Sequence, residues 1–280
     1  MNIGIIGQGF VGNAVYQKFK NFYEVLTYDL QRKLCNSSLV EVHMNCDYIF
    51  VCLPTPMSKD GSCHIGIVEE ALEELNKYCK LSGKGVTKTA IIKSTIPPGT
   101  TEKWNNKFSN LTIVFNPEFL TEVNAVQDYE NQSRIILGGP RKGTTPLKPI
   151  FSKVFPKAKI IKTNSTYAEM VKYTTNCFLA MKVSFANEMY EICQAVGADY
   201  DKVIEYAIED ERLGYSHWAV PGPDGDFGYG GHCFPKDVKA LIHLASDCNV
   251  SSIMLNAIDQ KNNNVRTNRD WEKMIGRAIV

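Results

Sequence analysis

Short apolar runs alternate with helical patterns through the first half of the chain. The runs are rich in β-branched residues and predict strands at Ile3–Ile6, Glu24–Tyr28, Tyr48–Leu53, Ala90–Lys93, Thr112–Phe115 and Arg134–Leu137. Between them, Asn13–Lys20 and Ile67–Tyr78 place apolar residues every three or four positions, as a crossover helix does. This alternation predicts an α/β fold with a parallel sheet covered by helices.

The pattern changes after residue 163. Ser165–Val196 contains neither Pro nor Gly and keeps apolar residues at helical spacing, so it predicts one long helix. Three residues are suitable as its N-cap: Asn164, Ser165 or Thr166. Glu169, three residues after Thr166, is typical of a capping box, and Gly197 is typical of a helix end.

Further helical segments follow this long helix. A shorter helix is predicted at Tyr200–Ile208, then a loop rich in Gly and Pro at Val220–His232, then a helix that begins near Pro235. The final residues are polar, rich in Asn and structurally ambiguous. Because 280 residues exceed the usual size of one core, we expect two domains. Residues 1–163 would hold a doubly wound sheet, and residues 164–280 the long connecting helix and a smaller all-helical domain.

Composition and charge exclude several classes of protein. The formal net charge is +1 and basic residues are scattered, which does not suit nucleic-acid binding. No stretch approaches the roughly 18 apolar residues of a membrane span, and the N-terminus lacks the pattern of an export signal. Nine cysteines without CxxC spacing indicate neither a disulfide framework nor a metal site. We expect a cytoplasmic protein with no metal, nucleic-acid or membrane partner.

Three glycines follow the first predicted strand at the start of a helix. Gly7 would permit a tight turn, Gly9 would let the backbone approach a pyrophosphate, and Gly12 would allow close helix packing. The helix N-terminus would favour the negative charge of the phosphates. The predicted loop consists of Gly7, Gln8, Gly9, Phe10, Val11 and Gly12.

An acidic residue lies where this loop requires one. Asp29 ends the next predicted strand, at the distance from the loop where a carboxylate accepts hydrogen bonds from a ribose. Strand, glycines, helix and acid together predict a Rossmann-like domain that binds NAD. Arg32 and Lys33 weaken the preference over NADP, because a cation there would hold a 2′-phosphate.

A single cysteine follows a flexible loop and precedes a predicted helix, in the segment Phe227-Gly-Tyr-Gly-Gly-His-Cys-Phe-Pro-Lys-Asp237. Pro235 suits the first helical position. A thiol at a helix N-terminus beside Lys236 is expected to have a lowered pKa, as a covalent nucleophile requires. The other eight cysteines are interpreted as buried and inert, whereas Cys233 is a candidate nucleophile.

Other polar residues admit both a functional and a purely structural interpretation. Lys172 and Asn176 are four residues apart on the predicted long helix, so they share a face and can direct a cation and an amide at an oxyanion. A solvated lysine and a locally bonded asparagine fit the same spacing. Glu118 and Glu122 are expected in the first turns of a helix, where the helix dipole favours acids without any function.

Five segments together resemble the UDP-glucose/GDP-mannose dehydrogenase family. The family has a GxGxxG start and an FGxGGxCxPKD segment, which Phe227–Asp237 matches. Three further segments resemble the family's in the same order: Lys93–Gly99 (STxPxG), Asn116–Glu122 (NPEFLxE) and Ala168–Asn176 (AExxKxxxN). The resemblance runs from Met1 to about Asn264. It covers the family's N-terminal and central domains, and we expect no counterpart of its third domain, which grips the substrate's nucleotide.

The resemblance implies an NAD-dependent, four-electron oxidation of a sugar-nucleotide alcohol to a carboxylate, with UDP-glucose as the family's commonest substrate. Two hydrides leave in succession, so the intermediate aldehyde must be held between the two steps. Cys233 would hold it as a thiohemiacetal, which is then oxidised to a thioester. Lys172 and Asn176 would stabilise the developing oxyanion.

The resemblance also implies the remaining contacts. Either Glu118 or Glu122 would activate the water that hydrolyses the thioester, and Thr95 and Asp237 would position water near the reacting carbon. NAD contacts are implied for the glycine loop and for Asp29, Lys33, Thr95 and Lys236. Substrate contacts are implied for Phe119, Leu120, Lys172, Asn176, Phe227, Tyr229, Gly230 and Gly231.

Two alternatives stay open from the sequence. One is a two-electron dehydrogenase of the hydroxyacid type, which also joins a Rossmann domain to a helical domain, although Cys233 argues against it. The other is a truncated relative that binds a dinucleotide without turnover, which the short length favours. An exposed apolar face on the long helix also predicts a homodimer through this helix, as in the family.

Overall fold

The computed structural model describes residues 1–81 and 88–280. The chain forms two compact units, the first of Met1–Thr55 and Ile65–Lys172 and the second of Pro56–His64 and Tyr173–Val280. This division differs from the expected boundary at residue 163. The first turns of the long helix pack with the first unit, and a short excursion of the N-terminal half belongs to the second.

The first unit contains one seven-stranded sheet with the order β2-β1-β3-β4-β5-β6-β7. Its strands are β1 (Asn2–Ile6), β2 (Glu24–Tyr28), β3 (Tyr48–Val51), β4 (Lys88–Ile92), β5 (Leu111–Phe115), β6 (Arg134–Gly138) and β7 (Lys159–Thr163). The six predicted strands are confirmed. The predicted doubly wound parallel sheet is confirmed in a mostly parallel form, in which β6 pairs with β5 in the antiparallel direction. The seventh strand, β7, was not predicted.

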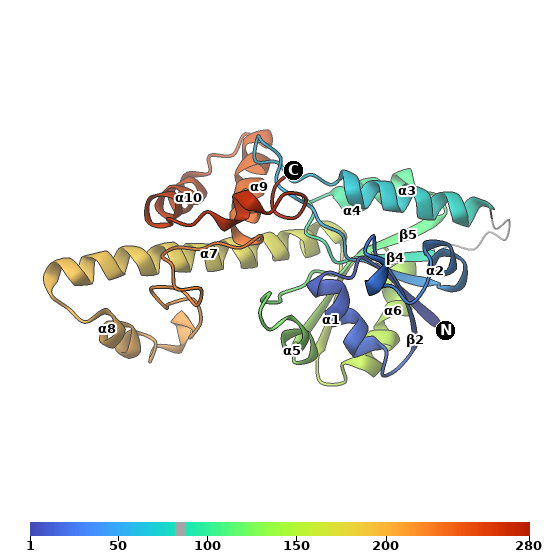
Figure 1. The fold of residues 1–280 in the computed structure, drawn as a ribbon, viewed down its shortest axis with the longest axis horizontal. Coiled ribbons are helices and arrows are strands. Elements are labelled where there is room, and N and C mark those ends of the chain that lie inside the picture. Colours follow the sequence, from blue (N-terminus) through green and yellow to red (C-terminus); the bar gives the residue numbers. More distant parts are fainter. Residues whose placement is uncertain (82–87) are drawn as a thin grey trace. The chain divides into compact units, whose positions relative to one another are not determined.

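Helices cover both faces of this sheet, as Figure 1 shows. The helices are α1 (Phe10–Phe19), α2 (Leu39–Asn45), α3 (Gly66–Leu81), α4 (Thr100–Lys107), α5 (Ala125–Glu130) and α6 (Arg141–Val154). Alternate strand residues face opposite ways: Ile49 and Val51 pack against α2, α3 and α4, whereas Phe50 packs against α1 and α6. Both faces of the sheet are therefore buried, as in doubly wound folds.

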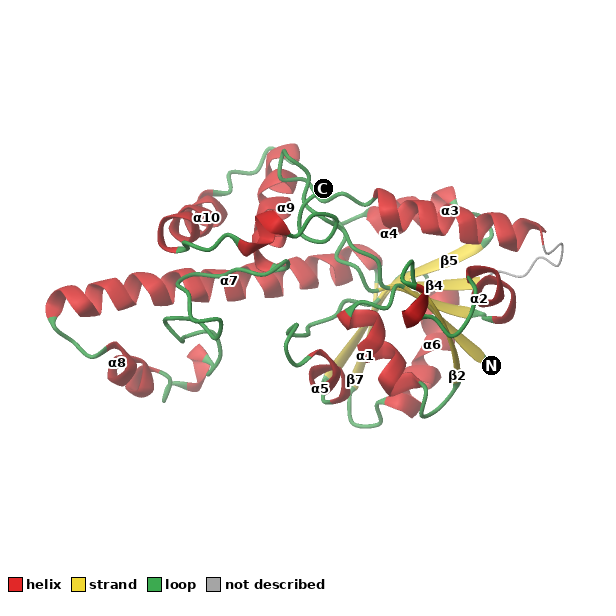
Figure 2. Ribbon diagram, in the orientation of Figure 1, coloured by secondary structure: helices red, strands yellow, loops and turns green. Residues whose placement is uncertain are grey.

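The second unit is built from helices and loops (Figure 2). It contains most of α7 (Ser165–Val196), α8 (Tyr200–Ala207), α9 (Phe234–Asp247) and α10 (Ile253–Val265). Two apolar clusters hold it together, one around Ala180 and Val238 and one around Ala186 and Tyr200. No helix within the described ranges is both long and apolar enough to cross a membrane.

The long helix has the predicted bounds, but one expected capping residue has another role. Asn164 is the N-cap, since its side chain accepts a hydrogen bond from the Tyr167 amide at 2.8 Å. Glu169, expected in a capping box with Thr166, instead accepts hydrogen bonds from the amides of Gly99 and Thr101 at 2.6 and 2.9 Å. It therefore caps α4, which is distant in sequence. Gly197 ends α7 with φ +73°, as predicted.

Candidate functional site

The glycine loop lies between β1 and α1, at the point where the strand order reverses. β1 pairs with β2 on one side and β3 on the other, so the carboxyl end of β1 is the switch point where doubly wound sheets bind ligands. Gly7 has φ +91°, and a Cβ at Gly12 would lie 1.9 Å from the Gly7 carbonyl oxygen. A Cβ at Gly9 would meet no atom within 4 Å, so space is open above this residue.

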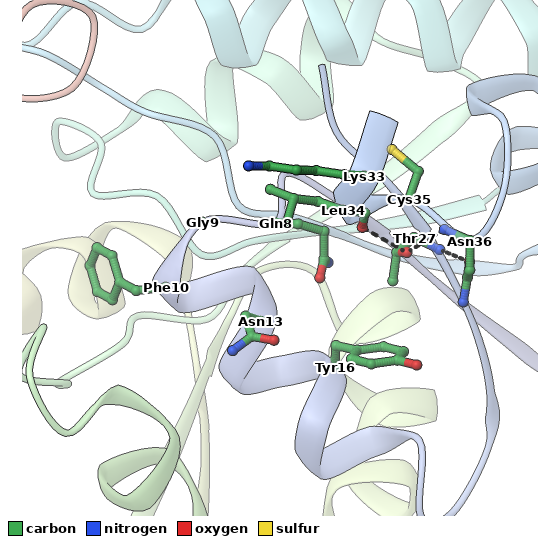
Figure 3. A pocket seen from close by; sticks show the side chains of 10 residues that line it. All are labelled: Gln8, Gly9, Phe10, Asn13, Tyr16, Thr27, Lys33, Leu34, Cys35 and Asn36. Carbon is green, nitrogen blue, oxygen red and sulfur yellow. Dashed lines mark hydrogen bonds between the residues drawn. The ribbon is translucent and has the colours of Figure 1, made fainter. Parts of the chain in front are cut away.

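A cavity of about 590 Å³ adjoins this loop, as Figure 3 shows. Gln8, Gly9 and Phe10 line it from the loop, and Thr27 and Lys33 line it from the end of β2 and the segment that follows. The remaining lining residues are Asn13, Tyr16, Leu34, Cys35 and Asn36. The cavity therefore joins the open backbone of the glycine loop to the end of the second strand.

Asp29 links the glycine loop to the segment that follows β2. Its carboxylate accepts hydrogen bonds from the Gln8 amide at 2.7 Å and from the Gln31 amide at 2.8 Å. Each carboxylate oxygen accepts about two hydrogen bonds, so Asp29 keeps acceptor capacity for ribose hydroxyls. The glycine loop, the free space above Gly9 and this acid fit a dinucleotide.

A group of buried ionisable side chains lies at the carboxyl ends of the strands in the first unit. Lys172 donates hydrogen bonds to the Glu118 carboxylate at 2.9 Å and to the Glu118 carbonyl oxygen at 2.6 Å. Lys93, which follows β4, donates to the side chain of Asn116 at 3.0 Å. Burial lowers the pKa of the Lys93 ammonium to about 8, although Cys52 and Glu118 act in the opposite direction.

The structure distinguishes the two candidate glutamates. Burial alone would raise the pKa of Glu118, but Lys172, the Leu120 amide and Lys93 outweigh it and hold the pKa below its usual value. Glu118 is buried, whereas Glu122 is exposed. The expectation that both lie in a helix is wrong, because 116–121 form a loop and α5 begins only at Ala125. Pro117 and the hydrogen bonds of Asn116 keep the chain extended past the strand.

Three other predicted residues of the first unit lie near these strand ends. Thr95 is buried, and its carbonyl oxygen accepts a hydrogen bond from the Thr55 hydroxyl at 2.8 Å. The Phe119 ring lies between two cations, 4.6 Å from the Arg134 guanidinium and 5.6 Å from the Lys172 nitrogen. Leu120 packs against the apolar cluster that contains α1 and α5.

In the second unit, Cys233 is the N-cap residue of α9. The prediction that this thiol lies at a helix N-terminus is thus confirmed, although the helix begins one residue before Pro235. The Asp237 amide donates to the Cys233 carbonyl oxygen at 3.0 Å, which closes the first turn. The Cys233 sulfur lies 3.9 Å from both ring nitrogens of His232, a contact at the limit of hydrogen bonding to sulfur.

Three predicted residues form a buried polar network behind this cysteine. Asp237 accepts hydrogen bonds from the Asn176 side chain at 2.6 Å and from the Lys236 ammonium. Burial would lower the pKa of Lys236, but Asp237 and Cys233 outweigh it and raise the pKa above its usual value. Since Asp237 is 1% exposed, its carboxylate is held in one orientation by both donors.

The loop before Cys233 directs its aromatic side chains into the second unit. The Tyr229 ring is buried against Phe234 at 5.9 Å, and the Phe227 ring contacts Tyr190 at 5.6 Å. A substrate contact from this loop would therefore come mainly from its backbone. The loop contains the four residues predicted to bind substrate here, Phe227, Tyr229, Gly230 and Gly231.

The structure brings some predicted residues together and shows others that sequence reasoning missed. Lys172 meets Glu118 in the first unit, and Asn176, Lys236 and Asp237 meet in the second. Lys93 and His232 were missed, although both lie inside the recognised motifs and carry ionisable side chains. Within residues 1–81 and 88–280, no group of three or more His, Cys, Asp or Glu side chains is arranged to hold a metal ion.

Comparison with known proteins identifies both parts of the chain. Residues 20–158 match the NAD-binding domain of the UDP-glucose/GDP-mannose dehydrogenase family, and residues 166–264 match its central domain. The chain is 34% identical over 226 residues to UDP-glucose 6-dehydrogenase YwqF of Bacillus subtilis, covering 78% of this chain and 49% of that protein. It is 34% identical over 233 residues to a GDP-mannose 6-dehydrogenase of Pseudomonas aeruginosa, covering 79% of this chain and 52% of that protein. The chain thus spans about half the length of these relatives.

Solved structures agree with these matches. A UDP-glucose dehydrogenase from Pyrobaculum islandicum has a TM-score of 0.85 and 26% identity, over 94% of this chain and 68% of that one. A ternary complex of the Pseudomonas aeruginosa GDP-mannose dehydrogenase has a TM-score of 0.69 and 27% identity, over 95% of this chain and 69% of that one. The chain belongs to the UDP-glucose/GDP-mannose dehydrogenase family and contains its NAD-binding domain and its central domain.

Proposed function

We propose that the protein oxidises the primary alcohol of a sugar nucleotide to a carboxylate with NAD, with Cys233 as the covalent nucleophile. The observation that supports this most strongly is the position of Cys233 at the N-terminus of α9, near the Lys236 ammonium and one turn before Asp237, which is hydrogen-bonded to Asn176. A helix N-terminus and a neighbouring ammonium both favour the thiolate. A two-electron oxidation releases its carbonyl product and requires no covalent thiol adduct, so a reactive thiol argues for the four-electron reaction.

The proposed chemistry assigns a step to each residue group. NAD, when bound, accepts a hydride in each of the two oxidations. Cys233 adds through its sulfur to the aldehyde carbon, and the carbonyl oxygen becomes the hydroxyl of a thiohemiacetal. Loss of a second hydride and of the hydroxyl proton leaves a thioester. Addition of water breaks the carbon–sulfur bond, which releases the carboxylic acid and returns the thiol.

Polar residues support the developing charges in this scheme. Lys172 and Asn176 are N–H donors one turn apart on α7, suited to an oxyanion. Glu118 is our choice for the carboxylate that activates water, since its lowered pKa keeps it ionised at neutral pH. Thr95 and Asp237 would position the water molecules. Phe119 and Leu120 would contact the substrate, as would the backbone of Gly230 and Gly231.

The cofactor contacts and the substrate follow from the same reasoning. We assign the NAD phosphates to the glycine loop, the ribose to Asp29, and further contacts to Lys33, Thr95 and Lys236. Among substrates we favour UDP-glucose, which gives UDP-glucuronate, because it is the family's commonest substrate. We also propose that the protein is a cytoplasmic homodimer that pairs through α7.

The stoichiometry of the reaction tests this proposal against its alternatives. Two NADH formed per UDP-glucose consumed is the expected result, and GDP-mannose serves as the comparison substrate. One NADH would instead indicate a two-electron enzyme. NAD binding with no NADH for any sugar nucleotide would indicate a dinucleotide-binding protein without turnover.

A cysteine variant tests the covalent step separately. Cys233→Ala is expected to lower the rate of acid formation by roughly a thousandfold or more, because the aldehyde can no longer be held as a thiohemiacetal. Cys248→Ala is the matched control, since Cys248 is exposed at the other end of α9. Acid formation at the wild-type rate by Cys233→Ala would show that the mechanism is wrong.

A further inference from the structure

Residues beyond the match to the family's central domain contact the loop that precedes Cys233. The match ends at residue 264, and the segment Arg266–Asp270 follows it directly. We propose that Arg266 and Asp270 are positioning residues that fix the backbone of Phe227–Gly231 and so orient Cys233 at the start of α9. The catalytic meaning of this positioning rests on the proposed function, but the positioning itself does not.

Asp270 binds the loop two residues before the cysteine. The Gly231 amide donates to both carboxylate oxygens of Asp270, at 3.1 and 3.0 Å. Gly231 has φ +69°, a left-handed conformation that glycine adopts without the strain a side chain would cause. A carboxylate that accepts from a backbone amide makes a stronger hydrogen bond than a neutral acceptor, so it can hold a turn that lacks helix or strand bonding.

Arg266 connects Asp270 to the start of the same loop. Its side chain is 1% exposed and forms ion pairs with Asp224 at 2.7 Å, and with Asp226 and Asp270 at 3.5 Å each. It also donates to the carbonyl oxygens of Asn268 and Phe227 at 2.8 and 3.5 Å. The planar guanidinium has five N–H donors in a fixed arrangement, which suits it to join several loop segments at once.

The glycines of the loop are explained by these neighbours. A Cβ at Gly230 would lie 2.2 Å from an Arg266 nitrogen and 2.5 Å from an Asp270 oxygen. A Cβ at Gly228 would lie 2.3 Å from the side-chain oxygen of Asn262, which accepts the Tyr229 amide at 2.7 Å. At position 230, to which the family resemblance assigns a substrate contact, a side chain would thus displace the arginine and the aspartate from their present places.

The first experiment measures how fast iodoacetamide alkylates Cys233, with the exposed Cys248 as the internal standard in the same protein. Asp270→Ala removes both acceptors of the Gly231 amide and is expected to slow alkylation of Cys233 several-fold at pH 7, because the thiol loses its fixed place at the helix N-terminus. Asp270→Asn keeps one acceptor oxygen and is expected to give an intermediate rate. Glu272→Ala, at an exposed position two residues later, is the matched control.

The kinetic constants give a second readout in active protein. Asp270→Ala is expected to lower kcat more than it raises the KM for NAD, because the glycine loop and Asp29, to which the NAD phosphates and ribose are assigned, belong to the first unit. An alkylation rate for Cys233 that is unchanged or higher in Asp270→Ala, relative to Cys248, would overturn the proposal. Alkylation needs no turnover, so a failure of the proposed function would leave this result interpretable.

If a variant does not fold, hydrogen exchange in the wild-type protein tests the proposed positioning of the loop instead. The amides of Gly228, Tyr229 and Gly231 are expected to exchange slowly although they lie outside helices and strands, because each donates to a side chain, those of Asn187, Asn262 and Asp270 respectively. Exchange of the Gly231 amide as fast as in an unstructured peptide would also overturn the proposal.

Discussion

Gly9 is the N-cap of α1 and Gly12 lies in the first turn of that helix, yet the two glycines have opposite surroundings. A Cβ at Gly12 would overlap the Gly7 carbonyl oxygen, a backbone atom that cannot move away without opening the turn. A Cβ at Gly9 would enter open space. Gly12 therefore serves the fold, whereas Gly9 keeps room for a ligand.

This contrast predicts two different phenotypes. Gly12→Ala is expected to destabilise the protein by about 1–3 kcal/mol through overpacking. Gly9→Ala is expected to leave the melting temperature unchanged and to weaken NAD binding by about tenfold or more, since a methyl group would occupy the place of the pyrophosphate. Thermal unfolding and NAD titration of both variants check this. Equal effects of both variants on unfolding would contradict it.

His43 predicts a pH dependence of stability. It is 1% exposed, its ring centroid lies 4.8 Å from that of Tyr78 with the two rings tilted by 47°, and neither ring nitrogen has a hydrogen-bond partner among the described residues. Burial, with a smaller contribution from Lys88, lowers its pKa from 6.5 to about 4. The folded state therefore favours neutral His43. The free energy of unfolding is therefore not reduced by His43 above pH 6.5, and it decreases as the pH falls from 6.5 toward 4.

The variant His43→Phe isolates this contribution. Relative to wild type, the unfolding free energy of the variant is expected to increase as the pH falls from 6.5 toward 4. The increase is at most about 1.4 kcal/mol per pH unit, the limit for one proton. Urea unfolding at several pH values measures the difference. The exposed His64 gives the control, and His64→Gln should follow the wild-type curve. Parallel curves for His43→Phe and wild type would contradict the assignment.

Among the elements, Glu169 makes the start of α4 depend on α7. It accepts from the amides of Gly99 and Thr101, so it satisfies donors that a helix N-terminus leaves unpaired. Glu169→Ala is expected to destabilise the protein by about 1–2 kcal/mol, as the loss of an N-cap does. Glu188→Ala, at an exposed site of α7, should change stability by less than about 0.5 kcal/mol. Denaturant unfolding that shows equal effects would contradict this role.

Elements whose apolar residues recur at a regular spacing could be predicted from the sequence. Elements with conflicting local signals could not. The long helix has no interior Gly or Pro and was placed at its true bounds. α6 was missed because Gly143, Pro146 and Pro149 indicate a loop, yet Leu147, Ile150 and Phe151 are buried at helical spacing. Tertiary burial outweighs the local cost of proline there. α10 was missed because its Asn-rich sequence lacks a clear apolar face.

The candidate site shows the same division. The glycine loop and Cys233 at a helix N-terminus are local features, so their short motifs predicted them. The partner of Lys172 lies 54 residues away, and that of Asn176 lies 61 residues away. Which side chains meet over such distances depends on how the strands and helices pack, and local spacing patterns and short motifs do not show that packing. The same reason explains why Glu169 was assigned to the wrong helix.

At the scale of the whole molecule, α7 has an exposed apolar face, on which the proposed homodimer would pair. Phe178, Phe185 and Ile192 recur every seven residues, so they lie on one face, and they are 55%, 52% and 46% exposed. Large apolar side chains at such exposure mark interaction surfaces in many soluble proteins. This supports the proposed homodimer without identifying its geometry.

A double variant tests this dimer. Phe178→Asp with Ile192→Asp is expected to convert dimer to monomer, because two charges would be buried without partners in the interface. Leu30→Asp is the control, at a 91% exposed site of the first unit, and should leave the dimer intact. Multi-angle light scattering measures the mass. A wild-type protein that is monomeric at all concentrations would refute the dimer.

The excursion Pro56–His64 has a consequence for how the molecule is synthesised. The chain leaves the first unit at Thr55, returns at Ile65 and leaves again at Lys172, so it crosses between the units three times. In the second unit, Met57 exchanges backbone hydrogen bonds with Ala278 and Val280, at 2.7 and 3.0 Å. During synthesis, residues 56–64 therefore emerge before these partners, which are made more than two hundred residues later. The strands on either side of the segment can already pair at that stage.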